Sequence, residues 1–424
     1  MPRTAARPIE TVRRPLDAVV RPPGSKSITN RALVVAGLAR DGSVSRLLDP
    51  LEADDTVAMR AGLRSLGVMV DDVDDPWLVL GTGGHLSGDT LIDAGASGTT
   101  ARFLTAVAAL ADGPVTIDGT ARMRQRPLSD LLEALAMLGA EVRSATGSPP
   151  VTVTGPLHAG RTEVSGATSS QFLSALLLIA PMLGDPVEVV VKGTQVSETY
   201  VTGTIEVMEA FGASVERRDG SYLVAPTGYD KAHFEIEPDA SAAVYPATAV
   251  AIAGGRVVIP GIASHSSQPD LAVLDVLAEM GCRVTRSEHE VLVEAEGAPL
   301  GAVDVDLSGS PDGALVLAVA CLFADGPSRL RGLGTLRAKE TDRLAALQTE
   351  LGKLGAVAEI EGDTLAITPG PPKAAAIETY DDHRMAMSFA LAGLRIPGVV
   401  ITDPECVSKT WPQYFDVLDA MCRG

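Results

Sequence analysis

Residues that could bind an anion or move a proton recur along this chain at nearly equal intervals. Steps of 71 residues, one of them 72, visit Ser27, Gly98, Ser169, Ala240, Asp312 and His383. Further steps of 71 from Asp55 visit Arg126, Ser197, Gln268, Lys339 and Thr410. Each position lies in a polar cluster ahead of an apolar, helix-like run that closes on a glycine. A fixed period means that each copy is one structural unit, so six units fill the chain.

Positive charge gathers at these predicted helix starts, although the chain carries a formal net charge of −19. The cations are Lys26, Arg31, Arg126, Lys339, Arg343, Arg384 and Lys409. A cation at a helix N-terminus costs about 0.3–1 kcal/mol, because that end already carries a partial positive charge. A bound anion removes the conflict, since the exposed NH groups and the cations both attract it. The pattern therefore predicts small anionic ligands, and the net charge argues against nucleic acid.

Two acidic residues stand beside these cations. Asp312 lies in the string SPDGA and Glu340 in KETDR. Either could be an ordinary first-turn acid of a helix, but paired carboxylates can also divide the roles of general acid and general base. His383 fits a structural hydrogen-bonding role slightly better than that of a proton carrier. No spacing of His, Cys or Asp matches a metal site, so we expect neither a metal nor a cofactor.

The string TSSQF at 168–172 offers two hydroxyls and an amide at a helix start. Serine before a helix is an ordinary cap, so Ser169 or Ser170 alone indicates only local structure. Beside the cations, Ser169, Ser170 and Gln171 would also suit a phosphate or the hydroxyls of a sugar-like ligand.

The elements that must position these residues repeat with the same period. Each copy reads as an apolar helix, a glycine turn, a short strand, a second helix and further strands, which predicts a mixed α/β (α+β) protein. At 424 residues the chain exceeds one ordinary core, so we expect two domains of three units each. No apolar run spans a bilayer, the N-terminus lacks the apolar core of a secretion signal, and the four cysteines show no paired spacing. We expect a cytoplasmic enzyme without a membrane partner.

Six strings taken together closely resemble one family. PGSKSITNRAL, RMRQRP, SSQFLSALL, KETDRL, DDHRMAM and SKTWPQYF occur in the order of the 5-enolpyruvylshikimate-3-phosphate (EPSP) synthase family, from about Pro22 to Phe415. The resemblance implies a two-domain inside-out α/β barrel of six βαβαββ repeats, three per domain. It also implies that residues 23–237 form one domain and that residues 1–22 join 238–424 in the other.

The activity implied by the resemblance is transfer of the enolpyruvyl group of phosphoenolpyruvate to the 5-hydroxyl of shikimate 3-phosphate. Inorganic phosphate is the second product, the pathway is the shikimate pathway of aromatic amino-acid biosynthesis, and the herbicide glyphosate competes with phosphoenolpyruvate. These two substrates would be the only partners of an enzyme that we expect to be a monomer.

Site roles follow from the resemblance position by position. Asp312 would take the proton of the attacking hydroxyl, Glu340 would protonate the methylene carbon, and Lys26 would touch both substrates. The residues implied for shikimate 3-phosphate are Lys26, Ser27, Arg31, Ser169, Ser170, Gln171, Ser197, Tyr200, Asp312 and Lys339. Those implied for phosphoenolpyruvate are Lys26, Gly98, Arg126, Gln171, Arg343, Arg384 and Lys409.

Four positions depart from the common pattern of the family. Ala96 and Thr335 stand where asparagine is usual, Phe103 replaces a frequent proline, and Gln125 replaces glutamate. They bear on affinity and inhibitor response more than on the reaction.

Three other functions stay open at this point. A transferase acting on UDP-N-acetylglucosamine would share the fold, although PGSKS, KETDR and DDHR match the shikimate branch better. A non-catalytic anion-binding protein of this fold would need neither Asp312 nor Glu340. A P-loop kinase would need the string GxxxxGK[ST], which the chain lacks.

Overall fold

The computed structural model describes residues 6–195 and 198–423 and divides into two compact units. We call the segment Gly24–Glu237 the middle unit. The segments Met1–Pro23 and Pro238–Gly424 together form what we call the terminal unit. The chain thus passes from one unit to the other twice, at Pro23–Gly24 and at Glu237–Pro238.

Three buried helices form the centre of the middle unit and pack on one another. They are α1 (Lys26–Leu38), α3 (Gly98–Ala108) and α5 (Ser170–Ile179). Every residue of α3 is buried, as expected for a helix that is apolar nearly all round. The second helix of each repeat is more amphipathic and lies at the margin of this core: α2 (Asp54–Ser65), α4 (Ser129–Met137) and α6 (Glu198–Ala210).

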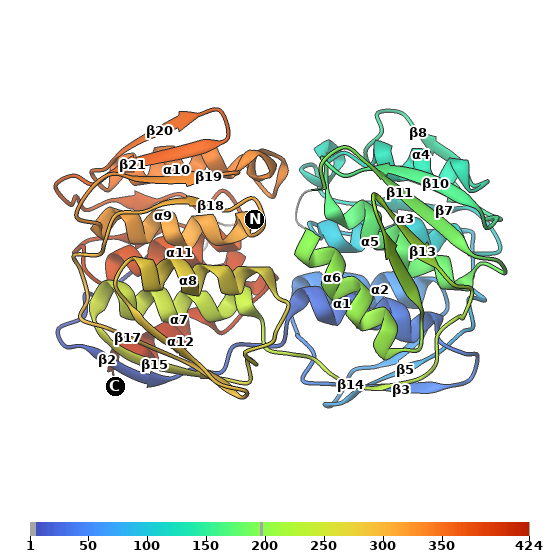
Figure 1. Ribbon diagram of the computed structural model, residues 1–424, viewed down its shortest axis with the longest axis horizontal. Helices are drawn as coiled ribbons and strands as arrows, with labels where there is room; N and C mark the ends of the chain where they lie inside the picture. Colours follow the sequence, from blue (N-terminus) through green and yellow to red (C-terminus); the bar gives the residue numbers. More distant parts are fainter. Residues whose placement is uncertain (1–5, 196–197, 424) are drawn as a thin grey trace. The chain divides into compact units, whose positions relative to one another are not determined.

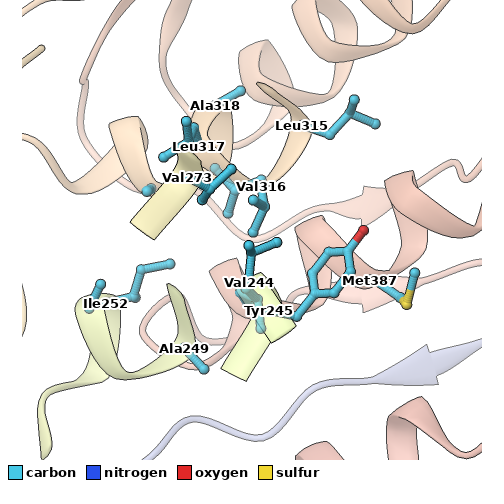
Figure 2. Close-up of a cluster of buried hydrophobic side chains, with 14 of the residues drawn as sticks. Val244, Tyr245, Ala249, Ile252, Val273, Leu315, Val316, Leu317, Ala318 and Met387 are labelled. Atoms are coloured by element: carbon cyan, nitrogen blue, oxygen red, sulfur yellow. The ribbon is translucent and has the colours of Figure 1, made fainter. Parts of the chain in front are cut away.

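The terminal unit repeats this arrangement. Its buried helices are α7 (Ala240–Ala253), α9 (Ala314–Ala320) and α11 (His383–Gly393). Its second helices are α8 (Ala272–Glu279), α10 (Arg343–Lys353) and α12 (Tyr414–Arg423). Figure 2 shows how Val244 of α7, Val316 of α9 and Met387 of α11 meet in the apolar centre. In both units the N-terminal ends of the buried helices carry the polar residues of the 71-residue register.

Each unit places its sheets outside its helices (Figure 1). The middle unit has three four-stranded sheets with the orders β14-β3-β5-β4, β6-β7-β9-β8 and β10-β11-β13-β12. Their strands are β3 (Val44–Leu48), β4 (Met69–Asp71), β5 (Trp77–Leu80), β6 (Thr90–Asp93), β7 (Val115–Asp118), β8 (Glu141–Ser144), β9 (Val151–Thr154), β10 (Arg161–Ser165), β11 (Val187–Lys192), β12 (Val215–Arg218), β13 (Ser221–Val224) and β14 (His233–Glu235). In each sheet the first pair is parallel and the others are antiparallel. Alternate residues such as Val115 and Ile117 face the buried helices.

The terminal unit has two four-stranded sheets, β16-β17-β15-β2 and β18-β19-β21-β20, and a three-stranded sheet, β1-β23-β22. Their strands are β1 (Arg7–Pro8), β2 (Leu16–Val19), β15 (Gly255–Pro260), β16 (Arg283–Arg286), β17 (Glu290–Ala295), β18 (Asp304–Asp306), β19 (Ser328–Arg331), β20 (Val357–Glu361), β21 (Thr364–Thr368), β22 (Ala376–Ile377) and β23 (Val400–Ile401). The last repeat ends with α12, and β1 from the start of the chain completes its sheet by pairing with β23.

Two strands serve a repeat other than the one that follows them in the chain. Strand β2 leads into α1 of the middle unit but pairs in parallel with β15 of the terminal unit. Strand β14 leads into α7 of the terminal unit but pairs in parallel with β3 of the middle unit. This exchange supplies each sheet with its first strand and accounts for the double passage of the chain between the units.

The register of the repeats holds to within two residues. Helix α1 begins at Lys26 rather than near Ile28, and α2 begins at Asp54, so that Asp55 lies inside its first turn. Among residues 6–195 and 198–423, none of the helices has the length and apolar character to span a membrane.

Candidate functional site

Arg343 is the centre of a buried charged cluster in the terminal unit. It is the first residue of α10, and its side chain is 1% exposed. Its Nε lies 2.7 Å from Asp382 Oδ2 and its Nη2 lies 3.1 Å from Asp382 Oδ1, a bidentate pair. Nη1 lies 2.9 Å from Asp312 Oδ1, and Nη2 also lies 2.9 Å from Glu340 Oε2. Burial disfavours its charge, but the three carboxylates outweigh burial and raise the pKa of Arg343.

Asp312 receives three cations. It lies in the 3₁₀ turn η4 (Pro311–Gly313), directly ahead of α9. Besides Arg343, Lys339 Nζ lies 3.1 Å from Oδ1, and Arg384 Nη2 lies 3.4 Å from Oδ2. Burial alone would raise the pKa of Asp312, but Lys339, Arg384 and Arg343 outweigh burial and hold the pKa well below its usual range. Asp312 is therefore an ionised carboxylate in this arrangement.

Glu340 and Lys339 precede α10. Glu340 Oε1 lies 3.1 Å from Lys409 Nζ, and its other oxygen contacts Arg343, so one carboxylate joins two cations. Lys409 ends the 3₁₀ helix η7 (Pro404–Lys409) and is buried. For Lys339, burial outweighs the attraction of Asp312 and lowers the pKa of the ammonium group.

Two further carboxylates complete the cluster, and the sequence gave no role to either. Asp382 is the N-cap of α11 and accepts the backbone NH of Arg384 at 2.9 Å while binding Arg343. Asp270, in η3 (Pro269–Leu271), is 1% exposed, accepts a hydrogen bond from Ser310 at 2.6 Å, and lies 3.8 Å from Arg384 Nη1. Burial raises the pKa of Asp270.

The cluster is close to neutral in formal charge. Four cations are balanced by four carboxylates: Lys339, Arg343, Arg384 and Lys409 against Asp270, Asp312, Glu340 and Asp382. The cations that the sequence indicated as an anion-binding set are thus engaged with acidic side chains. An anionic ligand would have to take these cations over from the carboxylates, which couples ligand binding to the state of Asp312 and Glu340.

In the middle unit, Lys26 and Asp55 form an ion pair. Lys26 is the first residue of α1, and its Nζ lies 3.2 Å from Asp55 Oδ2 at the start of α2. Asp55 is 3% exposed, so the pair joins the first turns of two packed helices. The sequence had placed Asp55 only in the register of repeats and not in the site.

Arg31, one turn after Ser27 on α1, is a buried guanidinium with a full set of acceptors. Nη1 donates to the Ser27 carbonyl at 2.9 Å, Nε to Thr204 Oγ1 at 2.7 Å, and Nη2 to the Tyr200 carbonyl at 3.3 Å. Its guanidinium carbon also lies 5.2 Å from the ring centroid of Phe103. Burial lowers the pKa of Arg31 to about 10, which leaves it charged at neutral pH. Arg31 therefore ties α1 to α6 and holds positive charge in place.

Arg126 lies against Gly98. A β-carbon built on Gly98 would lie 2.7 Å and 2.8 Å from the two terminal nitrogens of Arg126, and 2.6 Å from Arg102 Nη1. Glycine at the first position of α3 is therefore required by the close approach of two guanidinium groups. Arg126 is 7% exposed, and within the described parts of the chain its Nε and Nη1 have no hydrogen-bond partner. A buried cation in this state is prepared for an anionic ligand.

The start of α5 presents the hydroxyl and amide groups of the TSSQF string. Ser169 is the N-cap and accepts the backbone NH of Gln171 at 3.3 Å, while Ser170 is the first helical residue. Gln171 Nε2 donates to Thr99 Oγ1 at 3.2 Å, which joins α5 to α3. Tyr200 lies in the first turn of α6, where its carbonyl accepts from Arg31. Ser197 lies outside the described residues.

The predicted residues thus fall into one group in each unit, each built on helix N-termini. The sequence missed Asp55, Thr204, Asp270 and Asp382. Of these, only Asp382 had a recognisable signal, since it stands at the N-cap position within DDHRMAM. No trio of His, Cys, Asp or Glu suited to a metal ion occurs among residues 6–195 and 198–423.

Comparisons with known proteins agree on one family. The model of the family described as EPSP synthase (3-phosphoshikimate 1-carboxyvinyltransferase) matches residues 11–418. The chain is 40% identical over 432 residues to the 3-phosphoshikimate 1-carboxyvinyltransferase of Rhizobium leguminosarum bv. trifolii, covering 99% of this chain and 98% of that one. It is 42% identical over 417 residues to the protein of the same name in Thiobacillus denitrificans, with coverage of 95% and 96%.

Solved structures show the same fold. An EPSP synthase from Acinetobacter baumannii aligns with a TM-score of 0.81 at 22% identity, covering 99% of this chain and 98% of that one. The enolpyruvyl transferase NikO from Streptomyces tendae aligns with a TM-score of 0.77 at 19% identity, covering 98% and 97%. The family resemblance and the inside-out α/β fold expected from the sequence are confirmed.

Proposed function

The chain belongs to the EPSP synthase (3-phosphoshikimate 1-carboxyvinyltransferase) family and transfers the enolpyruvyl group of phosphoenolpyruvate to the 5-hydroxyl of shikimate 3-phosphate; we propose which residues carry each part of this reaction. The two substrates together bring two phosphates and two carboxylates. Fixed lysines and arginines are the groups that bind such anions most strongly, because each contact is a charge-assisted hydrogen bond.

Phosphoenolpyruvate is assigned to cations of both units, and the observation that carries the assignment is the state of Arg126. Its buried guanidinium lies over Gly98, and its Nε and Nη1 lack partners among the described side chains and backbone. The phosphate or carboxylate of a small ligand would satisfy it. The proposed set for this substrate is Lys26, Gly98, Arg126, Gln171, Arg343, Arg384 and Lys409.

Shikimate 3-phosphate is assigned chiefly to the starts of α1, α5 and α6. Hydroxyls at the N-terminus of α5 suit a phosphate, since the helix end adds its own NH groups and partial positive charge. Arg31 supplies a fixed charge on α1 for the carboxylate. The proposed set is Lys26, Ser27, Arg31, Ser169, Ser170, Gln171, Ser197, Tyr200, Asp312 and Lys339.

Asp312 and Glu340 are proposed to move the protons. As the 5-hydroxyl oxygen bonds to C2 of phosphoenolpyruvate, Asp312 takes the hydroxyl proton and Glu340 gives a proton to C3, which becomes a methyl group. Loss of one methyl proton then restores the double bond as the C2–O bond to phosphate breaks. The vinyl ether and inorganic phosphate are released, and no net proton or electron is left over. Each carboxylate acts once as donor or acceptor in each direction.

Ligand binding should adjust Asp312 for this role. In the structure three cations hold its pKa far below the usual range, which makes it a weak base. When a phosphate or carboxylate takes over Lys339, Arg384 or Arg343, their pull on Asp312 weakens and its pKa rises. The base would thus strengthen only when the substrates are bound.

The fold alone does not choose the acceptor, because NikO is an enolpyruvyl transferase with the same fold. The sequence relatives do favour one, since those at 40–42% identity carry the name 3-phosphoshikimate 1-carboxyvinyltransferase. Phosphate release should be measured with phosphoenolpyruvate and either shikimate 3-phosphate or UDP-N-acetylglucosamine, with a chelator present. We expect turnover with shikimate 3-phosphate only. Turnover with the nucleotide sugar would show a different transferase, and binding without turnover would show a non-catalytic protein.

A further inference from the structure

Glu350 is a buried carboxylate that the proposed reaction does not use. It lies on α10 with none of its surface exposed. Lys353 Nζ contacts it at 2.8 Å, the Tyr380 hydroxyl donates to Oε1 at 2.7 Å, and the backbone NH of Glu378 donates to Oε2 at 3.2 Å. A buried charge costs free energy unless it is fully paired, so a site that supplies three donors is a built feature.

The donors on the other side belong to a strained turn. Tyr380 and Asp381 both have a φ of 56°, in the left-handed region that favours glycine. Two consecutive non-glycine residues in this region persist only where the surroundings hold them. Glu350 provides that hold, because it binds the turn at the Glu378 NH and at the Tyr380 hydroxyl. Burial and the bond to Glu350 raise the pKa of Tyr380 to about 12, so its hydroxyl remains a donor.

The strained turn leads directly into the charged cluster. Asp382 follows it, caps α11 and binds Arg343 through both oxygens. Arg343 and Glu350 lie on the same helix, seven residues or about two turns apart, so α10 grips the segment 378–382 at two points. Arg343 in turn contacts both Asp312 and Glu340.

We propose that Glu350 and Tyr380 are positioning residues for the reaction. They fix the turn that places Asp382, and Asp382 orients the Arg343 guanidinium against the two proton-transferring carboxylates. Neither residue belongs to the proposed substrate-binding sets. The inference rests on the proposed function, because it assigns the turn a role in the geometry of that reaction.

Tyr380→Phe tests it by removing a single hydroxyl. A shift of about 1 Å in a positioning network can cost on the order of 100-fold in rate. We expect kcat to fall roughly 10- to 100-fold. KM for phosphoenolpyruvate should rise while KM for shikimate 3-phosphate stays unchanged, because only Arg343 and its neighbours move. A purely structural role would lower the melting temperature and leave kcat at 25 °C unaltered.

The matched control is Tyr229→Phe, since the Tyr229 hydroxyl also donates one buried hydrogen bond, to the Leu178 carbonyl at 2.9 Å in the middle unit. It should lose stability and keep kcat. Glu350→Ala should exceed Tyr380→Phe in its loss of kcat; if it fails to fold, the phenylalanine variant still decides. Normal kcat in Tyr380→Phe, an equal loss in Tyr229→Phe, or an equal rise of both Michaelis constants would overturn the proposal. An inactive wild-type enzyme would instead overturn the proposed function.

Discussion

Asp312 and Glu340 are held by the same guanidinium group, with Arg343 Nη1 2.9 Å from one carboxylate and Nη2 2.9 Å from the other. The planar fork of arginine fixes two partners in a way that a lysine cannot. Because Asp382 holds the remaining edge of the fork, the relative placement of the two carboxylates depends on a residue that neither of them touches directly.

Asp312→Asn and Glu340→Gln should each lose turnover and keep substrate binding. Each change removes proton transfer and preserves shape, and such groups contribute roughly 10²–10⁴-fold. In Asp312→Asn, three cations also lose a negative partner, so phosphoenolpyruvate should bind more tightly than in the wild type. Steady-state rates and a binding isotherm check both points. A near-normal kcat in either variant would remove that residue from its assigned role.

The pH dependence of kcat/KM should not report Asp312 at its acidic end. A carboxyl with a lowered pKa stays ionised as the pH falls, down to values below its ordinary 3.8. Any loss of kcat/KM between pH 7 and pH 5 must therefore come from another group. The residual activity of Asp312→Asn should show the same acidic limb as the wild type. Disappearance of that limb in the variant would assign it to Asp312 and contradict the charge arrangement described above.

Arg126→Lys should raise KM for phosphoenolpyruvate more than KM for shikimate 3-phosphate. Lysine keeps the charge but cannot reproduce two parallel hydrogen bonds to one anion. Hydrogen bonds to charged groups contribute about 1.5–3 kcal/mol, so we expect a rise of roughly 10- to 100-fold. Initial rates with each substrate varied in turn give the two constants. Equal changes in both would show that Arg126 does not belong to the smaller substrate.

Gly98→Ala should disturb Arg126 through its added methyl group. The new β-carbon would lie within 2.8 Å of three guanidinium nitrogens, so those side chains must move. Overpacking typically costs about 1–3 kcal/mol, and we expect KM for phosphoenolpyruvate to rise about 10-fold. Gly184→Ala is the matched control, because nothing lies within 4 Å of its β-carbon position and its backbone is not in the left-handed region. Kinetics of Gly98→Ala that match this control would show that the arginine side chains adapt without cost.

Much of this fold was predictable because its period is written in the chain. The register that visits Ser27, Gly98 and Ser169 marks helix starts, and apolar runs after them indicate buried helices. The exchange of β2 and β14 had no such signal. Either strand could pair with the sheet of the repeat that follows it, and only the completed sheets decide between the two.

The site was predictable in its residue types but not in its pairing. Cations at helix starts indicated anion binding, and the resemblance assigned roles to Asp312 and Glu340. The partners of Arg343 come from three separate segments, and Asp382 lies 39 residues further along the chain. A pattern of local spacing cannot show such contacts. It therefore could not show that acidic side chains already balance the cations of the terminal unit.

Proton NMR of the reaction in D₂O tests the central claim most directly. Phosphoenolpyruvate and shikimate 3-phosphate are incubated with the enzyme, and phosphate is measured alongside the vinyl-ether methylene signals. Because C3 passes through a methyl group, we predict one vinyl ether per phosphate, with solvent deuterium in its methylene group. Glu340→Gln should form neither product at a comparable rate. Phosphate released without a vinyl ether, or a vinyl ether formed only on UDP-N-acetylglucosamine, would contradict the account.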